Sequence, residues 1–368
     1  MRDDLSCAGE RAARTDRLKI VSEQGSKISL PPMEEARNSS ELSWDEPKGS
    51  WRAAQAYGRS PFQVDRSYLN KPLRVYLFGS HISESLSPKV NELVYKELQL
   101  SWTFSLYTTT DPDEFRRVIQ EPDVIGASVT MPNKLSFMPV ADVITDEVRA
   151  MGAMNTTFVK LDPQGRRLHI GTNTDWVGLK HTIYGMPRSE ELGRGRPSLV
   201  LGSGGAARSA LFAVWEAVCP SEIYVVNRAR SEAEEMIAGL GETAPRVKLR
   251  FIGSLDEART LPAPAVIVGT VPDTEPETAD EELAWQICTT FVKRQGKDGF
   301  VVDMSYMPSP HTSLCREAER HGATVRRGDE VLIQVCLAQI SFWAERDMNT
   351  GERARRILQQ IREADSRK

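Results

Sequence analysis

A run of small residues stands where a phosphate-binding loop would need it. The segment GSGGAA at 202–207 directly follows an apolar strand pattern and opens a segment with helical periodicity. Small residues permit a tight turn, and they let backbone N–H groups at the positive end of a helix approach a pyrophosphate. A plain structural turn is the alternative. The order strand, loop, helix favours dinucleotide binding.

The end of the next strand bears on the choice of dinucleotide. Asn227 stands there, Arg228 and Arg230 follow, and the first acid is Glu232. An acid at the strand end would hydrogen-bond the ribose hydroxyls of NAD and repel a 2′-phosphate, whereas guanidinium groups suit a phosphate. A solvated basic turn without a ligand is the alternative. The sequence favours NADP, with NAD possible.

A second group of polar motifs lies upstream, each at the end of an expected strand or in the following loop. Open α/β sheets bind their ligands at such strand ends. Hydroxyls, amides, one lysine and one aspartate would suit a small polyhydroxylated ligand, although each residue alone could be a helix cap or a turn residue. The motifs are SLSP at 85–88, SVTMPNK at 128–134, GAMNT at 152–156 and GTNTD at 171–175. The five histidines are dispersed, so we expect no metal site.

Lys134 and Asp175 supply the charged groups of these motifs. Oxidation of a secondary alcohol transfers a hydride to a nicotinamide, while the hydroxyl loses a proton. A lysine beside a carboxylate can take part in that proton transfer, since burial and the carboxylate shift its pKa in opposite directions. General acid–base catalysis by one such group typically contributes about 10²–10⁴-fold. A structural salt bridge is the alternative.

Strand and helix patterns alternate along the chain, which predicts an α/β fold whose first sheet is largely parallel. The predicted strands are 75–79, 102–107, 124–130, 155–160, 168–172, 199–201, 223–226, 249–251, 265–268 and 300–302, the last of which closes the series. The predicted helices are 87–98, 113–120, 134–144, 206–218, 232–240, 281–294, 312–321 and 331–345, followed by an amphipathic end. A turn at 162–165 predicts a hairpin.

We expect two domains, a substrate-binding α/β domain and a doubly wound Rossmann-type cofactor domain, with the site in the cleft between them. The expected boundaries are 1–72 for a disordered tail, 73–187 for the substrate-binding domain, completed by 303–368, and 188–302 for the cofactor domain. The tail prediction rests on mixed charges and almost no apolar periodicity. A docking or regulatory arm is the alternative.

Composition excludes several classes of protein. The chain has 368 residues and a formal net charge of −4, without the basic excess of a nucleic-acid binder. No apolar run reaches the length of a membrane span, and the first residues resemble neither a secretory signal nor a transit peptide. The five cysteines are scattered without CxxC spacing, which favours reduced thiols in a cytoplasmic protein over a disulfide framework or a zinc site.

Several of these motifs, in this order, resemble the shikimate dehydrogenases, and more closely the fungal quinate/shikimate dehydrogenases. The matching segments are YLFG at 76–79, SLSP at 85–88, TMPNK at 130–134, GTNTD at 171–175 and GTVP at 269–272. The resemblance covers about residues 73–345. It implies an NAD(P)-dependent oxidoreductase that interconverts a ring hydroxyl and a ketone on shikimate, quinate or a related cyclohexane or cyclohexene carboxylate. Aromatic biosynthesis, quinate catabolism and a specialised pathway all remain open.

The resemblance also implies roles for individual residues. Lys134 and Asp175 would form the catalytic pair. The substrate would contact Ser85, Ser87, Thr130, Asn155 and Asp175, with Tyr306 lining the same cleft. The cofactor would be cradled by Gly202, Gly204, Gly205, Ala206 and Ala207, and its adenosine end would meet Asn227 and Arg228.

Three residues depart from the pattern of that family. Val335 stands where the resembling enzymes carry a glutamine, Glu84 where they carry a histidine, and Ala229 where they carry threonine or aspartate. Loss of the amide at position 335 bears on which substrate fits. A non-catalytic ligand sensor is the alternative class, because fungal regulators of quinate use contain similar domains. The retained Lys134 and Asp175, and the absence of such regulators' additional domains, favour an enzyme.

Overall fold

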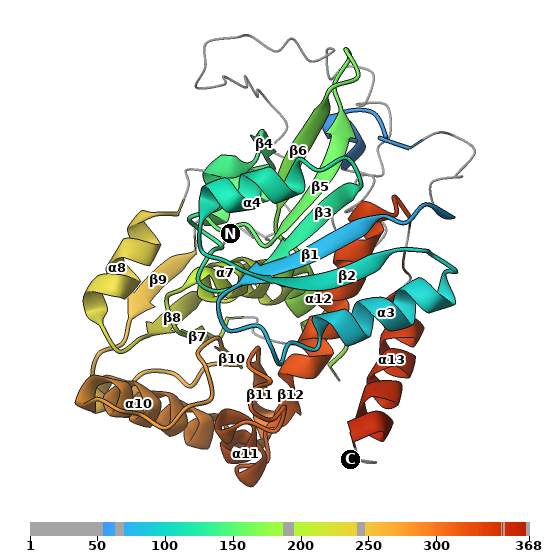
Figure 1. Ribbon diagram of the computed structural model, residues 1–368. Helices are drawn as coiled ribbons and strands as arrows, with labels where there is room; N and C mark the ends of the chain where they lie inside the picture. The colour runs from blue at the N-terminus through green and yellow to red at the C-terminus, as the bar shows by residue number, and fades with distance from the viewer. Residues whose placement is uncertain are drawn as a thin grey trace, which may run out of the picture. The chain divides into compact units, whose positions relative to one another are not determined.

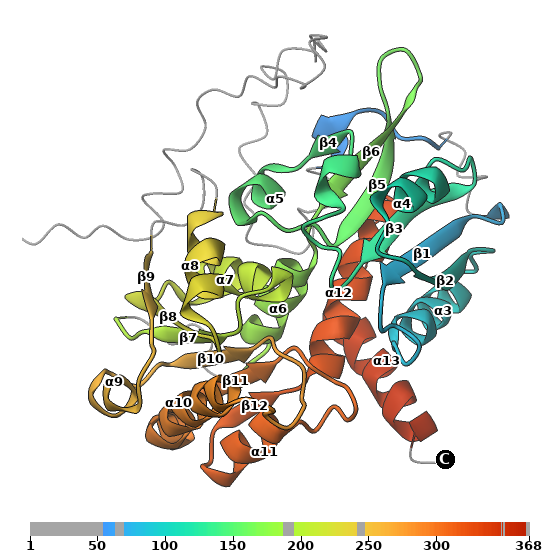
Figure 2. The ribbon, with the colours of Figure 1, turned by 60° about the vertical axis from the view of Figure 1, so that its left-hand side comes forward.

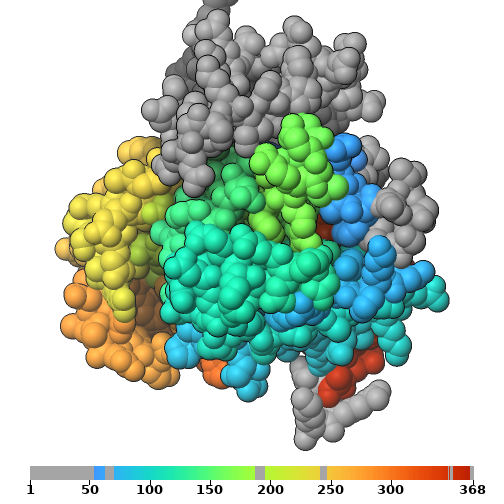
Figure 3. All heavy atoms as spheres, turned by 45° about the horizontal axis from the view of Figure 1, so that its top comes forward, coloured from blue at the N-terminus to red at the C-terminus, as the bar shows by residue number. Residues whose placement is uncertain are grey.

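The computed structural model describes residues 54–62, 70–186, 195–240, 247–346, 348 and 350–365. These residues form two sheets of six strands each, and all lie in the compact unit Asp45–Lys368 (Figure 1). The surfaces built on the two sheets lie side by side, the first in blue to green and the second in yellow and orange (Figure 3). Among the described residues, no helix has the length and apolar character that crossing a membrane requires.

The first sheet has the strand order β2-β1-β3-β5-β6-β4. Its strands are β1 (Arg74–Gly79), β2 (Thr103–Thr108), β3 (Val124–Val129), β4 (Val143–Ile144), β5 (Thr156–Leu161) and β6 (Arg167–Thr172). β1 pairs in parallel with β2 and β3, whereas β5 runs antiparallel to β3 and β6. The predicted largely parallel sheet is confirmed: of its six described strands only β5 runs against the others, because the short predicted hairpin can only join antiparallel strands.

The hairpin between β5 and β6 follows from its turn residues. The Asp162 carboxylate accepts hydrogen bonds from the backbone N–H groups of Gln164 and Arg166. Gly165 adopts a φ of +81°, which glycine tolerates without strain. The predicted turn is confirmed, and the antiparallel pair that it joins presents residues 155 and 172–175 at one edge of the sheet.

Helices from both ends of the chain cover the first sheet. They are α3 (Ser87–Glu97), α4 (Pro112–Ile119), α5 (Asp146–Met151), α12 (Gly328–Trp343) and α13 (Thr350–Asp365), with short 3₁₀ turns at Ala54–Tyr57 and Met138–Val140. α3, α12 and α13 share one apolar cluster with the sheet, which includes Ile340 and Ile357. α4 packs on the sheet through Phe115. Figure 1 shows α13 beside α3, so the amphipathic end predicted from sequence is a packed helix.

The second sheet is parallel throughout, in the order β12-β11-β10-β7-β8-β9. Its strands are β7 (Ser198–Leu201), β8 (Glu222–Val226), β9 (Lys248–Phe251), β10 (Val266–Gly269), β11 (Phe300–Asp303) and β12 (Thr324–Arg326). Read from β9, the order is that of the doubly wound dinucleotide-binding fold. The strand order reverses between β7 and β10, and ligands in this fold bind at that point. The expected α/β fold with a Rossmann-type sheet is confirmed.

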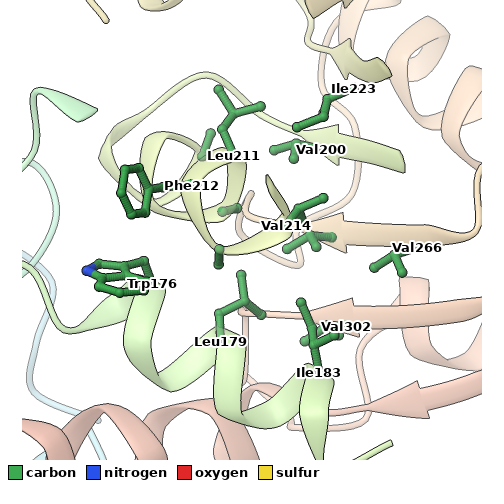
Figure 4. Packing of buried hydrophobic residues seen from close by; sticks show 14 of the residues in the cluster. Trp176, Leu179, Ile183, Val200, Leu211, Phe212, Val214, Ile223, Val266 and Val302 are labelled. Atoms are coloured by element: carbon green, nitrogen blue, oxygen red, sulfur yellow. The ribbon is translucent and has the colours of Figure 1, made fainter. Parts of the chain in front are cut away.

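Six helices and one 3₁₀ turn flank the second sheet in the described residues. They are α6 (Asp175–Tyr184), α7 (Gly205–Val218), α8 (Arg230–Ala238), α9 (Leu255–Thr260), α10 (Ala279–Gln295), α11 (Ser313–Arg320) and the turn Gly296–Asp298. α10 and α11 lie across the sheet from α6 and α7 (Figure 2). In Figure 4, Trp176 and Leu179 of α6 face Phe212 and Val214 of α7 within one buried cluster. Burying each such side chain contributes roughly 1.5–3 kcal/mol, which fixes α6 against α7.

The predicted helix at 134–144 is wrong. Only Met138–Val140 forms a helical turn there, and β4 follows as an edge strand paired with β6. Pro139 lacks the N–H that a continuing helix requires, and β-branched Val143 and Ile144 favour a strand. The prediction also missed α5, α6 and α9.

Two predicted boundaries also need correction. The disordered tail predicted for 1–72 is wrong over 54–62, because Ala54 is buried and Arg59 pairs with Leu161. Residues 1–53 and 63–69 lie outside the described residues. The second sheet extends past the predicted limit at 302, since β12 pairs with β11. The predicted start of that domain, at 188, lies outside the described residues.

Candidate active site

Lys134 and Asp175 form a close ion pair. Lys134 lies in the loop after β3, and Asp175 is the first residue of α6. The Lys134 Nζ donates to the Asp175 Oδ2 over 2.5 Å, and the two side chains are only 12% and 9% exposed. The positive N-terminal end of α6 stabilises the carboxylate further. The nearly buried, hydrogen-bonded Lys134 Nζ is thus held in one place at the end of the first sheet.

The other carboxylate oxygen of Asp175, Oδ1, is held by a chain of hydrogen bonds that begins at Gln339 of α12. The Asn155 Nδ2 donates to the Asp175 Oδ1 over 2.7 Å. The Thr156 hydroxyl donates to the Asn155 Oδ1 over 2.7 Å, and the Gln339 Nε2 donates to the Thr156 Oγ1 over 3.1 Å. These side chains are buried. Because Thr156 donates to Asn155, the amide of Asn155 can only turn its NH₂ toward Asp175.

Asn173 fixes the start of α6 and ties it to the second sheet. Its Oδ1 accepts from the backbone N–H of Asp175 over 3.0 Å, which satisfies a first-turn donor of the helix. Its Nδ2 donates to the Ser209 Oγ of α7 over 3.0 Å and to the Ala153 carbonyl over 2.9 Å. One amide therefore joins the helix that carries Asp175 to the helix that follows the glycine loop.

Hydroxyl groups gather near this pair at the start of α3. The Ser85 Oγ lies 3.5 Å from the Tyr306 hydroxyl and accepts the backbone N–H of Ser87. Burial raises the pKa of Tyr306, so this hydroxyl stays protonated. Burial also raises the pKa of Cys336 to about 12, with a smaller contribution from the nearby Asp175 carboxylate. The Cys336 thiol, on α12, thus lies near Asp175.

The glycine loop lies directly against the stem of Lys134. A Cβ placed on Gly205 would lie 2.9 Å from the Lys134 Cβ and 3.1 Å from its Cδ, so only glycine fits there. Gly202 has a φ of +119°, and a Cβ there would meet the Thr270 hydroxyl at 2.4 Å. A Cβ on Gly204 would meet nothing within 4 Å, and no side chain caps α7. The loop therefore offers open space over an uncapped helix N-terminus, which fits a pyrophosphate.

Glu232, in the first turn of α8, contacts Asn227 and Arg228 just after the end of β8. Its Oε2 accepts from the Asn227 Nδ2 over 2.8 Å and from the Ser203 hydroxyl over 3.4 Å. Its Oε1 accepts from the Arg228 Nη2 over 3.3 Å. The Asn227 amide and the Arg228 guanidinium lower the pKa of Glu232, which is therefore ionised at neutral pH.

The structure brings most of the candidate residues into two groups. In the first group, Lys134, Asp175 and Asn155 are in contact, and Gly205 adjoins them. In the second, Asn227 and Arg228 both contact Glu232. Ala206 and Ala207 lie in the first turn of α7. The Thr130 side chain has no hydrogen bond among the described residues, although its methyl lies close to Gly79. Arg230 points elsewhere, with its guanidinium 4.5 Å from the centre of the Phe251 ring.

Sequence reasoning missed Gln339, Cys336 and the placement of Glu232. Gln339 and Cys336 lie on a helix far along the chain, and nothing in their local pattern indicates the contact. The contact between Glu232 and Asn227 could have been predicted from the sequence, since the distance between these residues depends only on where α8 begins. The described residues contain no group of His, Cys, Asp and Glu able to hold a metal ion. The described cysteines are free thiols, and Cys7 lies outside the described residues.

Comparison with known proteins adds independent findings. Residues 77–157 match the family model described as the shikimate dehydrogenase substrate binding domain. The quinate dehydrogenase of Emericella nidulans is 33% identical over 289 residues, which cover 74% of this chain and 88% of that protein. The pentafunctional AROM polypeptide of Schizosaccharomyces japonicus is 32% identical over 277 residues, and these cover 74% of this chain but only 17% of that protein.

A solved structure is similar as well. It is the shikimate 5-dehydrogenase of Thermus thermophilus, in complex with NADP(H) and shikimate. The TM-score is 0.58 at 26% identity, and the match covers 77% of this chain and 99% of that one. The likeness therefore extends over both sheets.

Proposed function

The chain belongs to the shikimate dehydrogenase family of oxidoreductases, and on that premise we propose its reaction. It catalyses the reversible, NAD(P)-dependent oxidation of a ring hydroxyl on shikimate, quinate or a related cyclohexane or cyclohexene carboxylate. One observation carries the proposal. Gly205 of the glycine loop lies against the stem of Lys134, whose ammonium pairs with Asp175. A cofactor on that loop and a proton-transferring group would thus adjoin.

Lys134 and Asp175 are the proposed catalytic pair. The bound nicotinamide supplies hydride transfer, the chemistry of that cofactor. During oxidation the Lys134 Nζ takes up the proton of the reacting hydroxyl, and during reduction it returns that proton to the carbonyl oxygen. Asp175 keeps the Nζ in position through its Oδ2, and Asn155 holds the carboxylate through its Oδ1. Because the pair is nearly buried, the hydrogen bond between its members is stronger than it would be in water.

The substrate is proposed to bind beside this pair. Ser85, Ser87, Thr130 and Asn155 offer hydroxyl and amide groups for a polyhydroxylated ring, and Tyr306 adds a protonated phenol. Such groups hydrogen-bond a hydroxylated carboxylate without requiring a metal. Val335 places an apolar side chain on α12, where the resembling enzymes have an amide. We infer that the native substrate lacks a hydroxyl at that place, or carries an apolar or altered group there.

The proposed cofactor is NADP, with NAD possible. The glycine loop fits a pyrophosphate, and Gly202, Gly204, Gly205, Ala206 and Ala207 would hold it with backbone N–H groups. Asn227 and Arg228 would meet the adenosine end. The similar Thermus thermophilus enzyme binds NADP(H), which supports this choice.

Purified protein tests the proposal with two acids and two cofactors. We expect absorbance at the reduced nicotinamide band to rise when shikimate or quinate is supplied with NADP or NAD. Tight binding of either acid without turnover under any combination would contradict an enzyme and favour a ligand sensor. Turnover of neither acid, together with no binding of either, would show that the substrate class is wrong.

A further inference from the structure

Glu232 contacts the residues at the end of β8, where the adenosine ribose is expected to bind. α8 begins at Arg230, so its first turn brings residue 232 back over the end of β8. The Glu232 carboxylate accepts from Asn227 at that strand end and from Ser203 of the glycine loop. One carboxylate thus joins the two segments between which a dinucleotide lies in this fold.

The two arginines that favour NADP are both engaged. The Arg228 Nη2 donates to Glu232 over 3.3 Å, and its Nη1 donates to Glu281 over 3.0 Å. Arg230 pairs with Glu234 over 3.4 Å and stacks on Phe251. Arg228 would therefore meet a phosphate only by exchanging two carboxylate partners. The strand end is less positive than its sequence indicates.

We propose that Glu232 limits the enzyme's selectivity for NADP and lets NAD bind as well, an inference that rests on the proposed function. Its carboxylate competes with a 2′-phosphate for Arg228 and repels that phosphate directly. The ribose hydroxyls of NAD carry no charge and can donate hydrogen bonds to the same carboxylate. In the parent enzyme, the kcat/KM values for the two cofactors therefore lie within about tenfold of each other.

The experiment replaces Glu232 by glutamine, which keeps the size and removes the charge. Dissociation constants for NADPH and NADH come from fluorescence titration, and kcat/KM is measured for both oxidised cofactors. We expect Glu232→Gln to shift both ratios toward NADP by at least tenfold, which equals about 1.4 kcal/mol. Adding Arg228→Ala to this variant should abolish the shift, because the Arg228 guanidinium, which in Glu232→Gln keeps only Glu281 as a carboxylate partner, is what binds the phosphate.

Glu234→Gln is the matched control. It lies on the same helix and removes the same charge, but its carboxylate pairs with Arg230 and not with the strand end. We expect its ratios to stay within threefold of the parent. If the parent binds either cofactor but Glu232→Gln leaves both ratios unchanged, the inference about Glu232 is contradicted and the proposed function is not. A parent that binds neither cofactor contradicts this inference and the proposed function together.

Discussion

Lys134 is held at two points along its side chain. Its stem packs on Gly205 and its ammonium bonds Asp175, so the Nζ has little freedom. The residue belongs to the first sheet's loops, whereas Gly205 opens α7 on the second sheet. Any substitution at 134 therefore has to be chosen so that the packing on the glycine loop survives.

Lys134→Met retains the aliphatic stem and removes the proton-carrying group. We expect kcat to fall by about 10²–10⁴-fold, the usual contribution of one general acid–base group. The Kd for the reduced cofactor should stay within threefold, because the stem still packs on Gly205. Lys293→Met, at an exposed position of α10, is the control for loss of a lysine. Retention of kcat within threefold in Lys134→Met would remove Lys134 from the mechanism.

Val335 is buried on α12 against α6. Its Cγ2 would lie 2.5 Å from a Cβ placed on Gly178, one turn beyond Asp175. If the substrate is ordinary shikimate or quinate, a ring hydroxyl there lacks the amide of the resembling enzymes. A buried hydroxyl without a partner costs about 1–3 kcal/mol. That corresponds to roughly a 5- to 150-fold loss in kcat/KM.

Val335→Gln should therefore raise kcat/KM for shikimate or quinate by a factor in that range. Val335→Leu is the control, because it adds bulk without an amide and should give no gain. Rates for both acids are compared at a fixed cofactor concentration. An unaltered kcat/KM in the glutamine variant, from a parent that already turns over either acid rapidly, would mean that Val335 does not alter the substrate.

At the scale of elements, α12 is connected to the proposed catalytic pair by hydrogen bonds through the first sheet. Its Gln339 donates to Ser128 of β3 and Thr156 of β5, and Thr156 in turn orients Asn155. The helix thus reaches Asp175 through two intermediate side chains. Gln339, Thr156 and Asn155 are positioning residues in this respect, since we propose that the proton moves at Lys134.

Thr156→Val and Thr156→Ser test this chain of hydrogen bonds as a matched pair. Valine keeps the β-branched shape but removes the Thr156 donor to the Asn155 Oδ1 and leaves that amide to be oriented by Thr174, whose backbone N–H donates to the same oxygen, so kcat should fall by up to about tenfold and its pH profile should move. Serine keeps the hydroxyl and should restore the profile of the parent. Equal kcat and equal pH profiles in the two variants would show that Thr156 is only a packing residue.

Elements with one clear periodicity were predictable from the sequence. β1, β3 and the strands of the second sheet are short apolar runs that end at turn residues, and α7 follows its glycine loop. α6 carries little sequence signal, because buried side chains cover nearly its whole circumference. β12 has only three residues, all partly buried, so its pairing depends on β11 beside it.

In the candidate site too, the features set by local sequence were predictable and the contacts between distant segments were not. The glycine loop follows from local spacing, but the contact between Lys134 and Asp175 depends on how β3 and β6 lie in one sheet. Family resemblance supplied that pairing, and the residue pattern alone did not. The contact of Glu232 with Asn227 required the position of the α8 N-terminus, which the prediction put at residue 232 and the structure puts at Arg230.

At the scale of the whole molecule, one buried carboxylate makes the folding free energy depend on pH. Asp303 ends β11 and is 4% exposed. It accepts from the Thr312 hydroxyl over 2.6 Å and from the Ser305 backbone N–H over 3.1 Å, which anchors the loop that carries Tyr306. Burial raises the pKa of Asp303 from 3.8 to about 6, with a further contribution from the Asp273 carboxylate.

The raised pKa fixes the sign of the effect. Below pH 3.8 the carboxyl is protonated in both states and burial carries no charge penalty. Between pH 3.8 and about 6 the folded state holds a proton that the unfolded state has lost, so this group's contribution to stability falls as pH rises. Above pH 6 the penalty is complete. A shift of about two pKa units corresponds to about 3 kcal/mol.

Asp303→Asn removes that penalty. Its Oδ1 can still accept from Ser305 and its NH₂ can donate to Thr312, so most of the local hydrogen bonding survives. Relative to the parent, the free energy of unfolding of the variant should rise by about 2–3 kcal/mol between pH 4 and pH 8. Urea unfolding of both proteins at several pH values measures this difference. A constant difference across the range would mean that Asp303 ionises in the folded protein as readily as in the unfolded chain.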